Sequence, residues 1–145
     1  MRLSRMLHHD QYAQRAKALF EAFSDTLSEA PASIPQMVAA WQFSQAPACQ
    51  AFIAGDPHSA SGRQLARNVL RDFHPDLVVL YSRDATILSS DDADAVAAMR
   101  PVGGLPALYL CENFVCREPV TSPEKARRLL ARASDVDQGT NPGAR

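Results

Sequence analysis

The chain has 145 residues, of which 46% are hydrophobic, and this size and apolar content fit one ordinary globular domain with a buried core. Its 15 basic and 16 acidic residues leave a formal net charge of -1. This balance argues against a nucleic-acid partner and against a membrane-surface protein, because both classes usually carry a basic excess.

The start of the chain and its cysteines bear on where the protein works. No apolar run approaches the roughly 18 residues that a membrane span needs. Residues 1–10 are interrupted by charge too early for a signal peptide. Only three cysteines occur, an odd number, so a disulfide scaffold is not expected. We therefore predict a soluble, cytoplasmic protein.

Residues 1–46 are expected to form a helical hairpin. Apolar side chains in the first helix recur every three or four residues, as in an amphipathic helix: Tyr12, Ala16, Leu19, Phe20, Phe23 and Leu27. After a break at residues 30–33, Ser33 would cap the second helix and Pro35 would lie in its first turn. Two helices joined by a short loop make an αα-hairpin.

The two helices carry more apolar surface than they can bury against each other. Such stripes are buried fully only by further helices, and the rest of the chain supplies none. We therefore expect an exposed interaction surface that supports self-association or partner binding. Its predicted residues are Tyr12, Leu19, Phe20, Phe23 and Met37.

Residues 47–133 are expected to form a small three-layer α/β domain of order βαβ-α-ββα. The strands 50–55 and 77–81 flank a helix at residues 63–73, so they should be parallel with a right-handed crossover. The apolar residues of that helix follow helical spacing: Leu65, Ala66, Val69, Leu70 and Phe73.

The second half of this domain completes the predicted order. A short helix from Asp91 to Met99 is followed by a strand at residues 107–111 and a hairpin, and the last helix starts at Ser122 and Pro123. Residues 134–145 are expected to be a disordered tail. The order is that of a thioredoxin-like or Rossmann-like topology. Thioredoxin-like folds often place a cis-proline where Pro106 stands, and this analogy of fold assigns no function.

The first candidate site is the pair Cys111 and Cys116. A two-residue turn between the strands would place the two cysteines opposite each other, at a non-hydrogen-bonded position with Cα atoms about 4.5 Å apart. The preferred interpretation is two small thiols packed in a reducing cytosol. A somewhat strained disulfide with a redox role, or a metal site, remains the alternative, although zinc normally needs a second ligand pair. We predict no metal site.

The second candidate site is the loop between the first strand and its helix. Its possible ligand-binding residues are Gly55, Asp56, His58, Ser59 and Ser61. Ligands often bind at such strand ends, and helix N-termini attract anions. The chain has no G-x-G-x-x-G motif, no P-loop and no lysine here for a phosphate, so we predict no cofactor. The preferred interpretation is an ordinary loop in which a serine or an aspartate caps the helix.

One stretch supports a family assignment. Residues 107–123, ALYLCENFVCREPVTSP, resemble the C-terminal signature of the family that contains spermatogenesis-associated protein 20 and bacterial thioredoxin-domain-containing proteins. Residues 12–27, 34–37, 51–56 and 74–80 are similar to further segments of that family. The resemblance covers about residues 1–133.

This resemblance implies a larger architecture than the present chain. Family members open with a thioredoxin-like domain and continue with an (α/α) toroid similar to six-hairpin glycosidases and N-acylglucosamine 2-epimerases. Residues 1–46 look like the last toroid helices, followed by the α/β piece. The family's redox or carbohydrate chemistry would lie mainly outside this chain. Of the site residues, the resemblance carries over Cys111 and Cys116 alone.

The preferred function is therefore a non-catalytic C-terminal module or fragment of this family, acting in assembly. Its partner would be a second copy, or a polypeptide that bears the toroid or thioredoxin domain. One alternative is a thiol/disulfide redox role for Cys111 and Cys116. Another is a carbohydrate-related enzyme subunit that needs a toroid partner.

Overall fold

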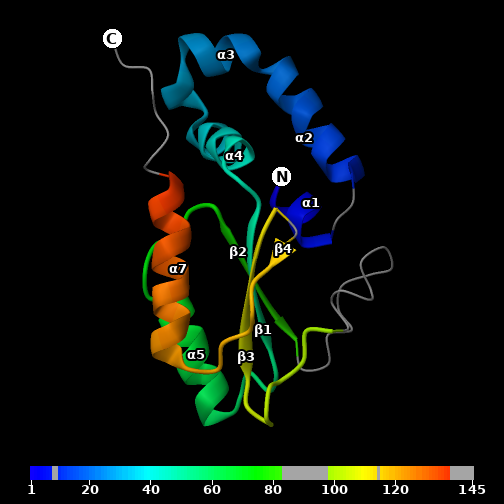
Figure 1. Ribbon diagram of the computed structural model, residues 1–145. Helices are drawn as coiled ribbons and strands as arrows, with labels where there is room; N and C mark the ends of the chain where they lie inside the picture. The colour runs from blue at the N-terminus through cyan, green and yellow to red at the C-terminus, as the bar shows by residue number, and fades with distance from the viewer. Residues whose placement is uncertain (8–9, 83–97, 114, 138–145) are drawn as a thin grey trace. The chain divides into compact units, whose positions relative to one another are not determined.

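The computed structural model describes residues 1–7, 10–82, 98–113 and 115–137 (Figure 1). It divides into two compact units, Met1–Pro47 and Ala48–Arg145. The predicted mixed α/β class is confirmed: the described residues form six α-helices and a four-stranded mixed sheet.

The N-terminal unit contains more helices than the expected hairpin. They are α1 (Arg2–Leu7), α2 (Asp10–Ala22), α3 (Ser24–Glu29), a 3-10 turn (Pro31–Ser33) and α4 (Pro35–Gln45). The expected long first helix breaks into α2 and α3 at Phe23, whose φ of -111° and ψ of 18° are not helical. The backbone bonds from Phe23 to Leu19 and from Leu27 to Phe23 keep the two parts nearly continuous. The sequence pattern did not predict α1.

The start of α4 corrects one predicted cap. Pro35 is its first residue, as expected, but the capping position belongs to Ile34, which makes no side-chain cap bond. Ser33 instead lies in the 3-10 turn and donates its hydroxyl to the carbonyl oxygen of Ala30, at 2.7 Å. Even without a side-chain cap, Pro35 suits the first turn of α4, because it has no N–H group that would be left unpaired.

The end of α4 is held by an arginine that the sequence analysis did not single out. Arg5, 8% exposed, donates to the carbonyl oxygens of Phe43 at 2.8 Å, Ala46 at 2.6 Å and Pro47 at 3.3 Å. Its guanidinium also lies 4.0 Å from the centre of the Phe43 ring. A cation at a helix C-terminus meets the negative end of the dipole and the last unpaired carbonyls. Arg5 thereby ties α1 to α4.

The long helices of this unit bury little. Among the described residues, α2 and α3 contain no buried side chain, and α4 contains only Phe43. Leu19 is 54% exposed and Trp41 is 46% exposed. The helices described in this unit therefore lack an apolar core of the kind that normally stabilises helices of this length.

The C-terminal unit is built on a sheet in the order β2-β1-β3-β4. The strands are β1 (Cys49–Ala54), β2 (Leu77–Ser82), β3 (Ala107–Glu112) and β4 (Val115–Cys116). As predicted, β1 and β2 are parallel. β3 is antiparallel to β1, and β4 is antiparallel to β3, so the sheet is mixed rather than wholly parallel as in a Rossmann fold. The mixed sheet is compatible with the thioredoxin-like alternative, although no described peptide bond, Leu105–Pro106 included, is cis.

Two helices cover one face of this sheet, α5 (Ala60–Leu70) and α7 (Pro123–Asp137), which lie side by side (Figure 1). Alternate residues of the strands meet them in one core: Ala51, Ile53, Leu65, Val69, Leu77, Leu108, Leu110, Ala126 and Leu130. On the other face, Phe52 and Ala54 pack with Leu80, Met99 and Tyr109. The predicted third layer, the helix from Asp91 to Met99, lies almost wholly outside the described residues.

Both helix ends differ from the prediction. α5 ends at Leu70 rather than at residue 73, so Phe73 leaves the helical stripe and is 90% exposed. α7 continues to Asp137, so residues 134–137 are helical rather than part of a tail. In the part of the chain that the structure describes, none of the helices has the length and apolar character to cross a membrane.

This difference on α5 predicts unequal effects of two substitutions that helical spacing alone would rank together. Leu65→Ala should lower the free energy of unfolding by about 2–5 kcal/mol, because it leaves a cavity in the core. Phe73→Ala should change it by no more than about 0.5 kcal/mol. Urea unfolding followed by circular dichroism measures both, and equal losses would show that Phe73 is buried.

Candidate functional site

The first candidate site is the hairpin formed by β3 and β4. Cys111 pairs with Cys116, and Glu112 pairs with Val115. The backbone N–H of Arg117 donates to the carbonyl oxygen of Leu110 at 2.9 Å. Hydrogen-bonded and non-hydrogen-bonded pairs alternate along such a ladder, so the two cysteines occupy the non-hydrogen-bonded position that the sequence predicts. Their Cα atoms are 3.8 Å apart, closer than the expected separation.

The two cysteines form a disulfide with an S–S distance of 2.05 Å. This corrects the preferred interpretation of two packed free thiols, since directly opposite side chains on one sheet face bring the sulfurs within bonding distance. The described residues contain no group of three or more His, Cys, Asp or Glu side chains that would suit a metal ion. Cys49 packs against the helix-covered core, on the opposite face from Cys111, whose β1 partner is Gln50.

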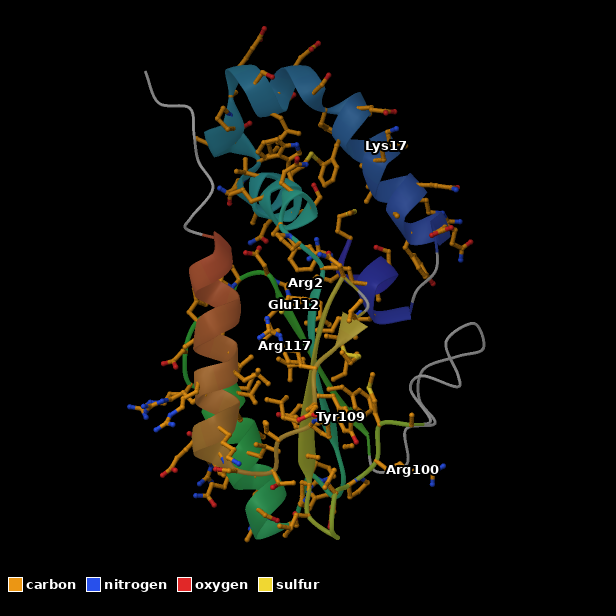
Figure 2. All side chains as sticks on the ribbon, in the orientation of Figure 1. Arg2, Lys17, Arg100, Tyr109, Glu112 and Arg117 are labelled. Atoms are coloured by element: carbon orange, nitrogen blue, oxygen red, sulfur yellow. A yellow bond between two sulfur atoms is a disulfide. The ribbon has the colours of Figure 1, made fainter. Side chains whose placement is uncertain are left out.

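The environments of the two sulfur-bearing residues differ. Cys111 is 2% exposed, whereas Cys116 is exposed on the edge strand beside Val115, which is 73% exposed. Next to Cys116, the Arg117 guanidinium donates to one carboxylate oxygen of Glu112 through Nη2 at 2.7 Å and Nε at 3.2 Å (Figure 2). Such a partly exposed ion pair adds little stability. Glu112 is the β1–β3 partner of Cys49, so its side chain lies on the opposite sheet face from Cys111.

The hairpin turn is anchored to the chain just before β1. Asn113 has a φ of 48°, in the left-handed region that asparagine tolerates better than most residues. Its N–H donates to the carbonyl oxygen of Ala48 at 2.8 Å, and its Oδ1 accepts from the N–H of Ala48 at 3.3 Å. Asn113 lies in the two-residue turn expected between the strands, but this anchor was not predicted.

The second candidate site, the loop between β1 and α5, uses its polar groups internally. Ser59 precedes α5, accepts from the N–H of Gly62 at 3.0 Å and donates to the carbonyl oxygen of Asp56 at 2.8 Å. The Asp56 carboxylate accepts from the N–H of His58 at 3.0 Å. These bonds are those of an ordinary turn and helix cap. A ligand-binding role for the loop stays a prediction.

Glycine is required at the start of this loop. Gly55 has a φ of 123°, and a Cβ there would lie 3.0 Å from Cα of Pro106. Ser61 is exposed, with its hydroxyl 3.4 Å from that of Ser59. The structure therefore brings Ser59 and Ser61 together and leaves His58 exposed at the surface.

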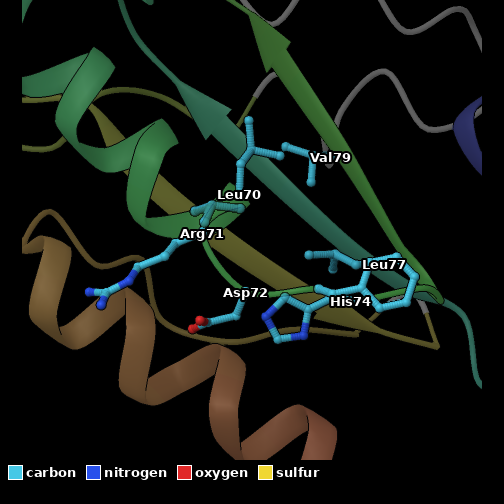
Figure 3. A pocket seen from close by; sticks show the side chains of 8 residues that line it. Leu70, Arg71, Asp72, His74, Leu77 and Val79 are labelled. Atoms are coloured by element: carbon cyan, nitrogen blue, oxygen red, sulfur yellow. The ribbon is translucent and has the colours of Figure 1, made fainter.

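Two open cavities of the C-terminal unit lie beside α5. One cavity, of about 300 Å³, lies where the chain leaves α5 and enters β2. Leu77 and Val79 form part of its apolar lining, and Figure 3 shows that the Arg71 side chain extends away from them. The other, of about 670 Å³, is lined by Arg63, Arg67 and Tyr81 among others, and burial raises the pKa of the Tyr81 hydroxyl. Spacing alone did not predict either cavity.

The N-terminal unit contains an apolar groove of about 540 Å³ between α2 and α4. Leu19, Phe20 and Met37 of the predicted interaction surface line it, whereas Tyr12 and Phe23 do not. The Lys17–Glu21 ion pair, at 3.8 Å, marks the exposed side of α2 (Figure 2). We call the apolar groove lined by Leu19, Phe20 and Met37 the α2–α4 groove.

The capping role of the loop predicts a modest effect on stability. Ser59→Ala should lower the free energy of unfolding by about 1 kcal/mol, because the N–H of Gly62 loses its acceptor. Ser61→Ala is the matched control and should leave stability nearly unchanged. Denaturant unfolding of both variants checks this. If Ser59→Ala leaves the free energy of unfolding unchanged, Ser59 is not a stabilising cap, and the hypothesis that it binds a ligand gains support.

No protein-family model and no solved structure matches the chain. It is 28% identical over 131 residues to spermatogenesis-associated protein 20 from Rattus norvegicus and from Homo sapiens, and 26% identical over 130 residues to an uncharacterized protein from Caenorhabditis elegans. Each match covers 90% of this chain, but only 17% of the mammalian proteins and 18% of the nematode protein. The family recognition made from the residues is thereby confirmed: the chain fits a C-terminal part of the spermatogenesis-associated protein 20 family.

Proposed function

We propose that this chain is a non-catalytic C-terminal module of that family, and that its N-terminal helices act in assembly by docking against further helices. The observation that carries the proposal is how little of the helices' apolar surface is buried among the described residues of that unit. Among the described residues, α2 and α3 contain no buried side chain, and the apolar α2–α4 groove stays open. Helices of this kind gain most of their stability from packing an apolar face.

The proportions of the match support the proposal that the helices filling the groove lie outside this chain. The chain spans 17% of the length of the mammalian relatives, so most of each relative lies outside the matched segment. The toroid implied by the resemblance would supply the helices that pack against α2 and α4. They would belong to the same long polypeptide or to a partner that bears the toroid or thioredoxin domain.

The exposed side chains set the scale of the gain. Fully burying a leucine, phenylalanine or methionine side chain contributes about 1.5–3 kcal/mol. Leu19, Phe20 and Met37 are each only partly covered in the unit. Without its own partner, the chain would cover the same groove with a second copy.

The other functions stay predictions. A carbohydrate-related activity depends on the implied toroid, and the present proposal assigns any such chemistry to that part of a longer protein. The cytoplasmic location predicted from the sequence also stays a prediction. The redox alternative stands on the disulfide and is argued separately below.

Self-association of the isolated chain tests the proposal. Across a concentration series in size-exclusion chromatography with light scattering, the chain should form dimers or larger species. The double substitution Leu19→Lys and Met37→Lys should shift it to monomer, because charged groups resist burial.

Phe73→Lys provides the matched control, since it removes an exposed aromatic residue outside the groove and should leave association unchanged. Circular dichroism confirms that each variant is folded. A wild-type chain that is monomeric at every concentration, and that binds no hydrophobic dye, would contradict the proposal.

A second measurement decides where the docking helices reside. An antibody to residues 107–133 should detect, in the source cells, a polypeptide several times longer than 145 residues. A band at the size of 145 residues would place those helices in a separate protein, which the same antibody should then co-precipitate. A short band without any helical partner would overturn the proposal.

A further inference from the structure

We propose that the Cys111–Cys116 disulfide is a thiol-exchange site, at which a small thiolate attacks Sγ of Cys116 and releases the hairpin turn from Ala48. The site belongs wholly to the C-terminal unit and does not depend on the proposed docking of the N-terminal helices. The ligand class is a low-molecular-weight thiol, with glutathione as the experimental probe.

Unequal exposure selects the sulfur that is attacked. Exchange requires that the incoming thiolate reach one sulfur of the disulfide. Cys111 is 2% exposed on the inner strand β3, whereas Cys116 is exposed on the edge strand β4. The flanking side chain of Val115 is itself 73% exposed, so it does not shield β4. A thiolate from solvent therefore reaches Cys116 first.

The local charge permits an anion to approach. Glu112 alternates with Cys111 along β3 and therefore points to the opposite face of the sheet, and its charge is offset by Nη2 of Arg117 at 2.7 Å (Figure 2). The pair places a cation next to Cys116 in the chain. Because the charges of Glu112 and Arg117 already offset each other, screening them with high salt should change the rate of exchange only modestly.

The reaction balances in two steps. In the first step, the thiolate RS⁻ forms a bond to Sγ of Cys116 while the S–S bond breaks. The electron pair of the broken S–S bond goes to Sγ of Cys111, which then takes a proton from water. Apolar surroundings favour that neutral thiol. A second thiolate then attacks the R-group sulfur, giving RSSR and the Cys116 thiolate. In total, two small thiolates are oxidised to one disulfide, the protein disulfide is reduced to the Cys111 thiol and the Cys116 thiolate, and the water that gave its proton is left as hydroxide.

Reduction removes the covalent tie of a very short strand. β4 has only two residues, and apart from the disulfide the described bonds that hold it include the Arg117 N–H to Leu110 and the Arg117–Glu112 ion pair. The Asn113 turn lies between the two cysteines and bonds to Ala48 twice, at 2.8 and 3.3 Å. Opening the disulfide should therefore increase the hydrogen-exchange rate of the Asn113 amide.

Variants that lack either Cys111 or Cys116 test the choice of sulfur. With oxidised glutathione, Cys111→Ser should gain one glutathione on Cys116. Cys116→Ser should gain it on Cys111 at least about tenfold more slowly, because that residue is buried. Cleavage after Glu112 separates the two positions, and the peptide with Cys49 is a reference common to both variants. Equal rates at the two positions would overturn the assignment.

The wild-type chain gives a second test that does not depend on how the variants fold. Incubated with reduced glutathione and quenched in acid, it should show a mixed disulfide on Cys116 and faster exchange of the Asn113 amide. A disulfide that stays closed at every glutathione concentration would refute the exchange site. An unchanged Asn113 amide in the reduced chain would refute the release of the turn.

Discussion

The C-terminal unit depends on the hydrogen-bonding of β1 along both of its edges. Each residue of β1 pairs with a residue of β2 on one side and of β3 on the other. A strand in this position is covered on both faces, and residues 50–54 are all buried. This explains why its sequence is nearly continuous in apolar residues rather than alternating. A one-residue shift of its register would exchange Ile53 and Phe52 between the two cores.

Both candidate sites follow from the two ends of this strand. At its C-terminal end, Gly55 turns the chain against Pro106, and Ser59 then caps α5. At its N-terminal end, Ala48 accepts and donates the bonds to Asn113, the tip of the hairpin. The loop uses its polar groups within its own turn, whereas the hairpin carries a disulfide with one buried cysteine, Cys111, and one exposed cysteine, Cys116. The proposed thiol exchange therefore belongs to the hairpin end of the sheet.

Sequence reasoning predicted the features that depend on local pattern. The parallel βαβ unit, the hairpin and the opposed Cys111 and Cys116 follow from apolar runs and from the spacing of turn residues. It failed where long-range contacts decide. The hydrogen bonds from Arg5 to the carbonyl oxygens at the end of α4 join residues about 40 positions apart, and no local pattern marks them. Phe73 has the right helical spacing, but α5 ends three residues earlier, so the spacing no longer applies.

The two units differ in what holds them, and this difference bears on function. The described residues of the C-terminal unit bury an apolar core, so its disulfide is not required to compensate for a missing core. The N-terminal unit has Arg5 and Phe43 but no core within its described helices. The residue that follows that unit in the chain is Ala48, to which the Asn113 turn is bonded. Ala48, the Asn113 turn and the disulfide all belong to the C-terminal unit, so the proposed exchange at Cys116 acts within that unit and is independent of the α2–α4 groove.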